Sequence, residues 1–558
     1  MTDLASVLDL PPALAGLLVR RGMNTPEAAR DFLHPSLGLL PSPFLLPELD
    51  QAVDRLIQAI SCGEPITVYG DYDADGLTAA VLLAGFLADL GARVTTYVPH
   101  RMDEGYGLNP GAVERLARSG TRLIVTVDCG VADHEAVLKA RELGLDVIIT
   151  DHHQTPPSLP PALAVINPHR FDSLFPYRPL AGVGVAFFVA GGLRQVMRQR
   201  GLLSRDNQPE LAPFLGLVAI GTVADVAPLT GVNRILVKAG LKHLAVPCQP
   251  GLAALKAISS IEQGRPLTAR EVAFRIAPRL NAAGRIDSPQ PGLRLLQTRD
   301  AGQAEAHAAE LDRINRQRRR LQSQVLDEAI AMLEETGGPD DKTIVLAREG
   351  WHPGVVGLAA ARLAEKYQRP AILLTLDNGL ARGSGRSIRG FNLFRALDQC
   401  RDLLVRFGGH EQAAGLTLEI DRIPLLASAF ERIAASEIDE QATTSYLDVD
   451  AEITLEDLDR GWGEYLSYLA PFGEGNPEPI FTVSGLSVLS AGCVGTNHLK
   501  LTLTKGSRSL DTIGFSLGHL LPELGPRVGV VIQRHTTYYR GRTAQGWKVV
   551  DIRREDGP

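Results

Sequence analysis

Three aspartates at alternate positions, directly after one short apolar run, constrain this chain more than any other feature. Ile66–Tyr69 is typical of a buried strand. The chain then places carboxylates at Asp71, Asp73 and Asp75, before a glycine and a helical run. Carboxylates crowded at a strand end repel one another, which costs stability unless a cation offsets their charge. One aspartate would be an ordinary helix cap, but three favour a divalent metal, provided that further ligands follow downstream.

The length of 558 residues predicts several domains of roughly 100–200 residues each. The longest apolar run, Val183–Leu193, is broken by glycines and is shorter than the roughly 20 residues that span a bilayer. The first residues carry no basic leader, so we expect no export signal and a cytoplasmic protein without membrane contact. The five cysteines form no Cys-x-x-Cys pair, which disfavours a zinc site and a disulfide framework.

Between residues 51 and 245, short apolar strands alternate with helical runs. We expect strands at 66–69, 93–98, 122–127 and 146–150, and helices at 77–90, 110–119 and 132–143. This alternation predicts an α/β fold with a doubly wound parallel sheet, in which ligands bind outside the carboxyl ends of the strands. The third strand ends in Asp128 and the fourth in Asp151-His152-His153, so three strands bring carboxylates and imidazoles to one edge. Asp225 follows an apolar helical run and, taken alone, is as readily a cap as a ligand.

Residues 246–340 are expected to form a helical connector. Apolar residues recur at helical spacing from Ala304 to Met332, and the same run carries five arginines within eight residues. Three of them, Arg313, Arg316 and Arg320, share one helix face. A charge run is most often a solvated face, but in a chain of net charge −7 this one favours a phosphate-bearing partner.

Three segments rich in small residues and arginines predict further phosphate contacts. The segment 279–285 is expected to be a loop bracketed by Arg279 and Arg285. Residues 341–440 predict a second, smaller α/β unit, which contains the glycine-rich runs 382–387 and 408–415. Glycines expose backbone amides, and arginine and serine add donors for phosphate oxygens. Such runs are often merely turns, but the order Arg-Gly-Ser-Gly-Arg-Ser favours phosphate.

The two ends of the chain differ in character. Residues 1–50 predict a small helical lead-in with frequent prolines. From about residue 445 the pattern becomes β, with strands expected at 480–483, 499–504, 509–515 and 528–533. Aromatic and basic residues then interleave, among them Tyr538 and Arg540. A small barrel with stacking rings and cations would suit single-stranded nucleic acid; an ordinary β domain explains the pattern about equally well.

Several of these runs, in this order, resemble the motifs of one family. Motifs similar to those of the DHH phosphoesterases are Asp71–Gly76, Asp128, Asp151–His153 and Asp225. Runs similar to the associated DHHA1 domain are Gly350–Gly357, Arg382–Ser387 and Gly408–His410. With a C-terminal region that resembles an OB fold, the chain from about residue 50 onward resembles the bacterial RecJ family of single-strand-specific exonucleases. Some relatives carry a further C-terminal domain, which we expect this chain to lack.

The resemblance implies domains and a ligand set for two divalent cations, Mn²⁺ or Mg²⁺. The domains would be a lead-in (1–50), a DHH catalytic domain (51–245), a helical connector (246–340), a DHHA1 domain (341–440) and an OB-like nucleic-acid-binding domain (445–558). Asp73 and Asp128 would hold the first cation. The second would be held, with Asp128 bridging, by Asp75, Asp128, His152 and Asp225. His153 would lie beside the scissile phosphate, and Asp71 joins Asp128 and His153 as a catalytic residue. Related pyrophosphatases carry a histidine where this chain has Tyr69, so the first cation is expected to have fewer protein ligands.

The function implied is 5′→3′ hydrolysis of single-stranded DNA to 5′-mononucleotides in DNA repair and recombination. We expect a monomer that works with a single-strand-binding protein and a helicase. Expected nucleic-acid contacts are Arg279, Asn281, Arg285, Arg313, Arg316, Arg320, Ser384, Arg386, Ser387, His410, Tyr538 and Arg540.

Two alternatives belong to other classes. A phosphoesterase for short oligonucleotides or cyclic dinucleotides is similar in its first two domains, but generally lacks the arginine-bearing helix and the C-terminal β domain. A non-catalytic scaffold, such as the RecJ-like subunit of the eukaryotic replicative helicase, is disfavoured because decayed sites usually lose carboxylates.

Overall fold

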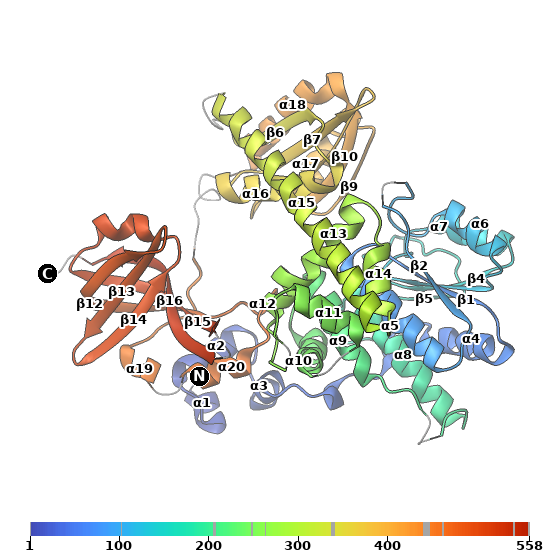
Figure 1. Cartoon of the computed structure of the whole chain (residues 1–558), viewed down its shortest axis with the longest axis horizontal. Helices are drawn as coiled ribbons and strands as arrows, with labels where there is room; N and C mark the ends of the chain where they lie inside the picture. Colours follow the sequence, from blue (N-terminus) through green and yellow to red (C-terminus); the bar gives the residue numbers. More distant parts are fainter. Residues whose placement is uncertain are drawn as a thin grey trace.

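The computed structural model describes residues 2–101, 103–204, 208–246, 249–262, 264–335, 341–438, 447–459, 462–539 and 542–555. Three sheets form three lobes, and the long helix α15 (Ala301–Glu335) runs from the first lobe to the second (Figure 1). Among the helices of these ranges, none combines the length and the apolar character that crossing a lipid bilayer requires.

The first lobe is a sheet with helices on both faces (Figure 1). Its elements are α4 (Leu49–Cys62), β1 (Ile66–Gly70), α5 (Ala74–Asp89), β2 (Val94–Tyr97), α6 (Pro110–Arg118), β3 (Leu123–Val127), α7 (His134–Glu142), β4 (Asp146–Thr150), β5 (Ala164–Ile166), α8 (Gly182–Gln199), α9 (Leu215–Ala224) and α10 (Gly231–Ala245). The strands are all parallel, in the order β2-β1-β3-β4-β5. Side chains alternate between the faces: Val68 and Val125 share a core with α5 and α8, whereas Tyr69 and Ile124 share one with α6 and α7. Both faces are therefore covered, which confirms the predicted doubly wound sheet and adds β5.

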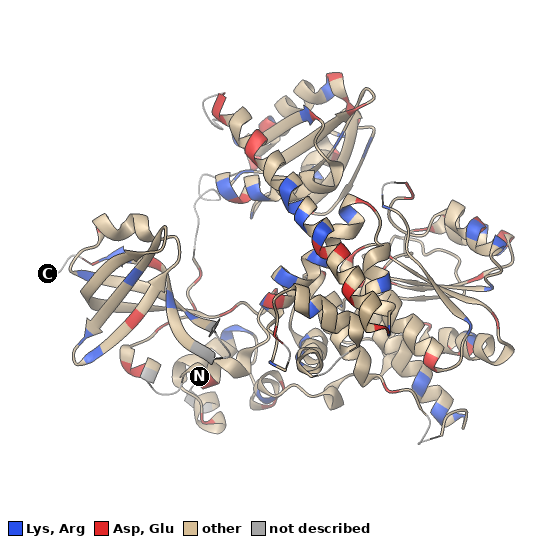
Figure 2. Ribbon diagram, in the orientation of Figure 1, with Lys and Arg blue, Asp and Glu red and all other residues tan. Residues whose placement is uncertain are grey.

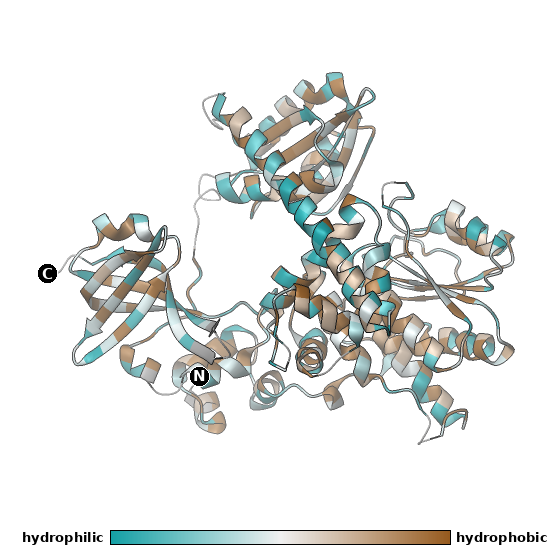
Figure 3. Ribbon diagram, viewed as in Figure 1, coloured by the Kyte–Doolittle hydropathy of each residue, from teal (hydrophilic) through white to brown (hydrophobic). Residues whose placement is uncertain are grey.

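Helices connect this lobe to the second sheet. They are α11 (Pro250–Ile258), α12 (Ala269–Glu271), a π-helical turn (Val272–Ile276), α13 (Ala277–Ile286), α14 (Gln290–Gln297) and α15. The segment 279–285, expected as a loop, lies within α13. Helix α15 contributes Ala308 and Leu311 to the core of the first lobe and Val325 and Ala329 to the core of the second. Its middle is hydrophilic (Figure 3). Because its two ends pack in the two cores, this one helix sets the spacing of the two lobes.

The second lobe is a mixed sheet in the order β6-β7-β8-β10-β9. Its elements are β6 (Ile344–Glu349), α16 (Pro353–Tyr367), β7 (Ala371–Asp377), β8 (Leu380–Arg386), α17 (Leu393–Gln399), β9 (Arg406–Gly409), β10 (Ala413–Glu419) and α18 (Ile423–Glu437). The glycine-rich run 382–387 is not a turn but almost entirely strand β8. Its glycines fit because β8 packs closely: a Cβ on Gly383 would lie 2.0 Å from the carbonyl oxygen of Leu373.

The third lobe is a closed five-stranded barrel. Its elements are β11 (Ala451–Glu452), α19 (Leu455–Asp459), α20 (Trp462–Leu469), β12 (Ile480–Val494), β13 (His498–Lys505), β14 (Arg508–Gly514), β15 (Arg527–Tyr539) and β16 (Arg542–Arg554). Strand β12 pairs with both β13 and β15, and β16 pairs with β14 and β15, which closes the ring. Strand β16 was not expected from the sequence. The barrel confirms the predicted OB-like architecture.

The N-terminal helices pack on this barrel, at the opposite end of the sequence (Figure 1). They are α1 (Thr2–Leu8), α2 (Pro12–Arg20) and α3 (Pro26–Leu33). Leu14 and Phe32 belong to the same apolar core as Trp462 and Phe481. Arg234 of α10 fastens this assembly to the first lobe, because its guanidinium donates to the carbonyls of Phe32 and of residues 468–471. Burial lowers the pKa of this guanidinium to about 9.

Candidate active site

The register of the first sheet brings its acidic strand ends together. Gly70 at the end of β1 pairs with Val127 at the end of β3, and Val127 pairs with Thr150 at the end of β4. The next residues along the chain are Asp71, Asp128 and Asp151. Because the strands are parallel and in register, these carboxylates emerge side by side at one edge of the sheet.

The other two aspartates of the first motif have distinct local roles. Asp73 caps α5, with its carboxylate accepting from the backbone N–H groups of Asp75 and Gly76 at 2.9 and 3.0 Å. The capping interpretation is therefore right for Asp73, although its carboxylate also faces the cluster. Asp75 accepts from the N–H groups of Gly182 and Val183 at 2.7 and 2.9 Å, at the start of α8. Helix α8 thus fixes Asp75 at the positive end of its dipole.

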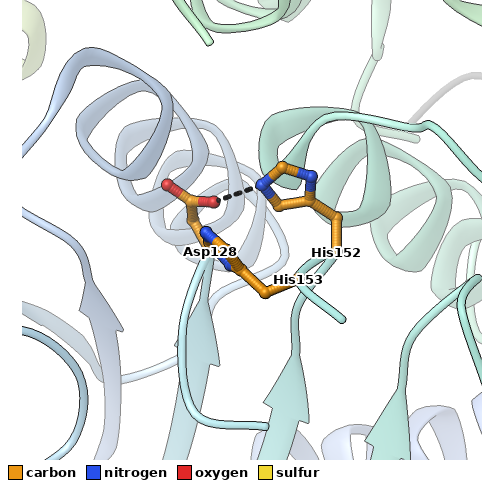
Figure 4. Close-up of side chains that lie close together, drawn as sticks. All are labelled: Asp128, His152 and His153. Atoms are coloured by element: carbon orange, nitrogen blue, oxygen red, sulfur yellow. Dashed lines mark ion pairs between the residues drawn. The ribbon is translucent and has the colours of Figure 1, made fainter. Parts of the chain in front are cut away.

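Three overlapping groups of donor atoms in the described residues have the composition of divalent cation sites. Two of them share no residue: Asp71, Asp73 and Asp128, and Asp75, His152 and Asp225; the third is Asp128, His152 and His153. Within each group the ligand atoms lie within 4.8 Å of one another. Asp128 connects the groups, because its Oδ1 atom lies 3.0 Å from Nε2 of His152 (Figure 4). Carboxylate and imidazole donors in this mixture suit Mn²⁺, and the carboxylates also suit Mg²⁺.

The cluster carries buried polar atoms and charges that a cation would satisfy. Among the described residues, Oδ1 of Asp71 is buried without a hydrogen-bond partner, and the buried Oδ1 of Asp128 and Nε2 of His152 meet as an ion pair at 3.0 Å without hydrogen-bond geometry. Burial, together with the neighbouring carboxylates, raises the pKa of Asp71 and Asp128 well above the usual value. The same causes raise the pKa of Asp75 and Asp225 to about 7. A bound cation would reverse these shifts by favouring the ionised forms.

Tyr69, the residue that stands where related pyrophosphatases have histidine, faces away from the cluster. Its ring stacks on Tyr97, and its hydroxyl donates to the carbonyl of Gly107 at 2.9 Å. Tyr69 is fully buried in the core beside α6 and α7. It therefore adds no ligand to the Asp71 group.

His153 is held by a partner to which the sequence alone assigned no role. Asp151 accepts from Nδ1 of His153 at 2.7 Å and from the N–H of Val131 at 3.0 Å. Burial lowers the pKa of His153, but the hydrogen bond and charge of Asp151 outweigh it and raise that pKa to about 9. The hydroxyl of Tyr106 lies 3.1 Å from the same Nδ1 atom. The imidazole is thus oriented through its Nδ1 atom by Asp151 and Tyr106.

Arginines from three separate elements complete the pocket that opens on the cluster. It has a volume of about 280 Å³, and its lining includes Asp71, Asp73, Asp128 and Asp225. The same pocket is lined by Arg101 from the loop after β2, Arg285 from α13 and Arg386 from β8. Burial and the neighbouring arginines lower the pKa of Arg285 to about 10. The structure describes no ion pair for these three arginines, so together they can bind an anion with more than one charged oxygen.

Some of the nucleic-acid contacts predicted from the sequence lie at this pocket, and others lie outside it. Asn281 lines the pocket and accepts from the N–H of Ala74 at 2.7 Å, while Ser384 accepts from Nη1 of Arg386 at 2.9 Å. Arg279 does not line this pocket: its guanidinium is held by Asp312 at 3.1 Å. Ser387 donates to the carbonyl of Phe391, and His410 lies exposed in the turn between β9 and β10. Arg101 was missed, because nothing in the sequence marks a single arginine in a long loop.

The arginines of α15 lie where the helix passes between the two α/β lobes (Figure 2). Arg313, Arg316 and Arg320 line one shallow pocket of about 330 Å³ together with Gln317. Arg316 is 65% exposed and pairs with Asp312 at 3.3 Å. On the opposite side Leu311 is fully buried, Ile314 is 5% exposed, and Leu321 packs on the second core. The predicted shared face of the three arginines is therefore present.

The barrel presents an aromatic cluster different from the one expected. Arg540 and the side chain of Tyr538 lie outside the described residues. Phe515 stands between His498 and His535, with ring centroids at 5.4 and 5.2 Å. Its side chain is partly open to solvent at 43% exposure, so it can accept a stacked base.

Three family models match the chain. They are the DHH family N-terminal domain at residues 65–222, the DHHA1 domain at 340–436 and the RecJ OB domain at 449–551. The single-stranded-DNA-specific exonuclease RecJ of Bacillus subtilis is 39% identical, over 99% of this chain and 70% of that protein. The protein of the same name from Escherichia coli is 36% identical, over 93% of this chain and 92% of its own length.

Solved structures agree over nearly the whole chain. RecJ from Thermus thermophilus in complex with Mn²⁺ matches with a TM-score of 0.84 and 33% identity, over 99% of this chain and 78% of that one. Its complex with Mg²⁺ matches with a TM-score of 0.77 and 32% identity, over 99% and 76%. With this identity over this length, and with donors arranged for the cations that the solved relatives hold, the chain belongs to the RecJ family of metal-dependent, single-strand-specific exonucleases.

Proposed function

We propose that the chain removes nucleotides from the 5′ end of single-stranded DNA by two-metal hydrolysis, releases 5′-mononucleotides, and acts in DNA repair and recombination. The observation that carries the proposal is the shared pocket, in which a carboxylate–imidazole cluster faces Arg101, Arg285 and Arg386. A single-strand-binding protein and a helicase as partners, and a monomeric enzyme, stay predictions from the family resemblance.

The residues of the cluster have separate tasks in this proposal. Asp71, Asp73 and Asp128 would hold one cation, and Asp75, His152 and Asp225 the other, with Asp128 shared. Cations bound there supply an activated water and neutralise charge on the phosphate. His153, held by Asp151, would donate a hydrogen bond to the scissile phosphate.

Polarity follows from the arginines of the pocket. A 5′-phosphorylated strand carries a terminal phosphate with two charges, whereas a 3′ end carries a neutral hydroxyl. Arg285 and Arg386 can bind the terminal phosphate through charge-assisted hydrogen bonds, and they line the same pocket of about 280 Å³ as the metal ligands. The terminal nucleotide would thus be cut off singly, from the 5′ end.

The assay that tests this function uses the same strand labelled at either end. Single-stranded DNA, duplex DNA and a dinucleotide are offered with Mn²⁺, and the products are followed in time. We expect a 5′ label to appear at once as mononucleotide, while a 3′-labelled strand shortens gradually. Initial release of a 3′ label would contradict the polarity. Preferred cleavage of the dinucleotide would favour a short-oligonucleotide phosphoesterase, and no cleavage would favour a scaffold.

Arg316→Ala combined with Arg320→Ala is expected to weaken single-strand binding and reduce its salt dependence. Removal of one arginine–phosphate pair lowers the slope of log K against log salt by about 0.7 for a single strand, so removal of two lowers it by about 1.4. Runs of digestion should shorten, while dinucleotide hydrolysis, which needs only the cluster and the end pocket, should stay normal. The measurement is binding of a phosphorylated strand across a salt series.

The matched control replaces two arginines that are equally exposed but lie elsewhere. Arg118 and Arg362 are 74% and 59% exposed and each pairs with a glutamate on its own helix. Arg118→Ala combined with Arg362→Ala changes the net charge by the same amount. An equal change of slope in both double variants would mean that the α15 arginines act only through net charge.

Phe515→Ala is expected to raise the KM for long strands and leave short strands unaffected. Loss of one stacked base costs about 1–3 kcal/mol, or roughly 5- to 150-fold in affinity. A point substitution is a more specific test than deletion of the barrel. Helices α1–α3 share the core of the barrel, and deletion would expose these helices. Leu489→Ala is the control, since Leu489 is an equally apolar barrel residue at 69% exposure. Equal effects on short and long strands would show that Phe515 is structural.

A further inference from the structure

The two deepest arginines of the pocket belong to different parts of the chain, and helix α16 touches both. Arg285 is on α13 in the connector, and Arg386 is on β8 in the second lobe. Helix α16 begins at Pro353, with His352 as its cap: Nδ1 of His352 accepts from the N–H of Gly354 at 3.0 Å. The first two turns of α16 therefore lie at the junction of the two lobes.

Gly354 permits contact between α16 and the backbone of Arg285. A Cβ at position 354 would lie 1.9 Å from the carbonyl oxygen of Arg285, far inside van der Waals contact. The atom it would meet is backbone, so a rotamer change cannot relieve the clash. Gly284, the residue before Arg285, is packed in the same way: a Cβ there would lie 2.9 Å from the carbonyl oxygen of Tyr72. The backbone at Arg285 is thus fixed between the first lobe and α16.

Gly357, one turn further along α16, makes room for the other arginine. A Cβ at position 357 would lie 3.0 Å from Nη2 of Arg386 and 2.9 Å from Oγ of Ser384. Ser384 itself accepts from Nη1 of Arg386 at 2.9 Å and donates to the carbonyl of Ala414 at 3.2 Å. The guanidinium of Arg386 is thus held between Ser384 and the bare backbone of Gly357.

We propose that Gly354 and Gly357 are positioning residues: they set the spacing of Arg285 and Arg386, and through it the preference for a phosphorylated 5′ end. The inference rests on the function proposed above, in which these arginines bind the terminal phosphate. One face of one helix then determines the geometry of a pocket whose walls come from two lobes. Bidentate recognition of a phosphate depends on the direction of the guanidinium as well as on its charge.

Gly357→Ala is the decisive variant, because the new methyl group meets side-chain atoms that can move. Its expected effect is about a tenfold fall in the ratio of kcat/KM between 5′-phosphorylated and 5′-hydroxyl strands, as for loss of one charge-assisted hydrogen bond. Activity on the 5′-hydroxyl strand and Mn²⁺ binding by titration should change little. Combined with Arg386→Ala, it should cause no further fall in the ratio, because it acts through that arginine.

Two more variants complete the experiment. Gly191→Ala is the matched control: Gly191 is also inside a helix, but the nearest atom to its Cβ would be a Leu211 methyl at 3.9 Å. Gly354→Ala should lower the ratio further, with folding checked by the Tm; if it fails to fold, Gly357→Ala still decides. A Gly357→Ala ratio equal to that of Gly191→Ala overturns the inference alone. An unchanged ratio in Arg386→Ala overturns the end pocket, and this inference with it.

Discussion

Asp128→Asn is expected to reduce hydrolysis by about 10²- to 10³-fold, the loss seen when a group that stabilises transition-state charge is removed. Asp128 belongs to the group with Asp71 and Asp73, and its Oδ1 atom lies 3.0 Å from His152 of the other group. Removal of its charge therefore affects both proposed cation positions. Strand binding should persist, because the arginines of α15 and the rings of the barrel are separate surfaces.

Asparagine is a better replacement than alanine at this position. The backbone of Asp128 has φ +63°, in the left-handed region, which asparagine tolerates and alanine does not. Asp9 has φ +53° and is exposed outside the cluster, so Asp9→Asn is a control matched in both chemistry and backbone. A loss of activity confined to Asp128→Asn then reports the carboxylate and not the turn.

The same variant should lose activity but be more stable than the wild type in the absence of metal. Burial and four neighbouring aspartates raise the pKa of Asp128, which means that its charge is unfavourable in the metal-free fold. Asparagine removes the charge of residue 128, so the Tm of the metal-free protein should rise. The additional rise in Tm on adding Mn²⁺ should be smaller than in the wild type. The measurements are single-turnover cleavage, strand binding by anisotropy, and Tm with and without Mn²⁺. Near-normal cleavage by Asp128→Asn would show that the carboxylate is not shared between the cations.

The carboxylate–imidazole cluster could be predicted because its position depends on the order and direction of the strands more than on side-chain packing. Once alternation of strands and helices implies a parallel sheet, residues that follow the strands must meet at one edge. Asp71, Asp128 and Asp151 satisfy that rule in register. Asp225 comes from the end of a helix, where the same carboxylate could have been only a cap, so the pattern alone left it open and only the family resemblance implied its place in the cluster. Strand β5 has only three residues, too few for a recognisable pattern.

The arginine pocket could be predicted only in part, because local conformation decides which arginines converge. Arg279 and Arg285 were equivalent candidates while their segment was interpreted as a loop. In helix α13 they are six residues apart, about 240° around the axis at 100° per residue, so only one can face the pocket. Arg285 does, and Arg279 turns to Asp312. The packing of the N-terminal helices on the barrel is a contact between the ends of the sequence, which no local pattern reports.

Arg285→Ala and Arg386→Ala are each expected to lower kcat/KM on a 5′-phosphorylated strand by about 10- to 150-fold, the range for removal of one hydrogen bond to a charged group. Both guanidinium groups line the pocket, and neither is held by a carboxylate that the structure describes there. A 5′-hydroxyl strand lacks the terminal phosphate, so it should lose far less. Arg386→Lys should recover little, because an ammonium group keeps the charge but not the paired donors.

Arg279→Ala tests whether an arginine outside the pocket affects end preference as the two pocket arginines do. Arg279 was an equal candidate from the sequence, but the structure places its guanidinium on Asp312 and on the carbonyl of Ile258. The substitution should therefore lower the Tm without changing the ratio between 5′-phosphorylated and 5′-hydroxyl strands. The measurement is that ratio for wild type, Arg279→Ala, Arg285→Ala and Arg386→Ala under the same Mn²⁺ concentration. If Arg279→Ala lowers the ratio as much as the other two, the arginines act as a diffuse positive field. If only the two pocket variants lower it, the terminal phosphate is bound at a defined place in the pocket that also holds the metal ligands, which would support the proposed cleavage from the 5′ end.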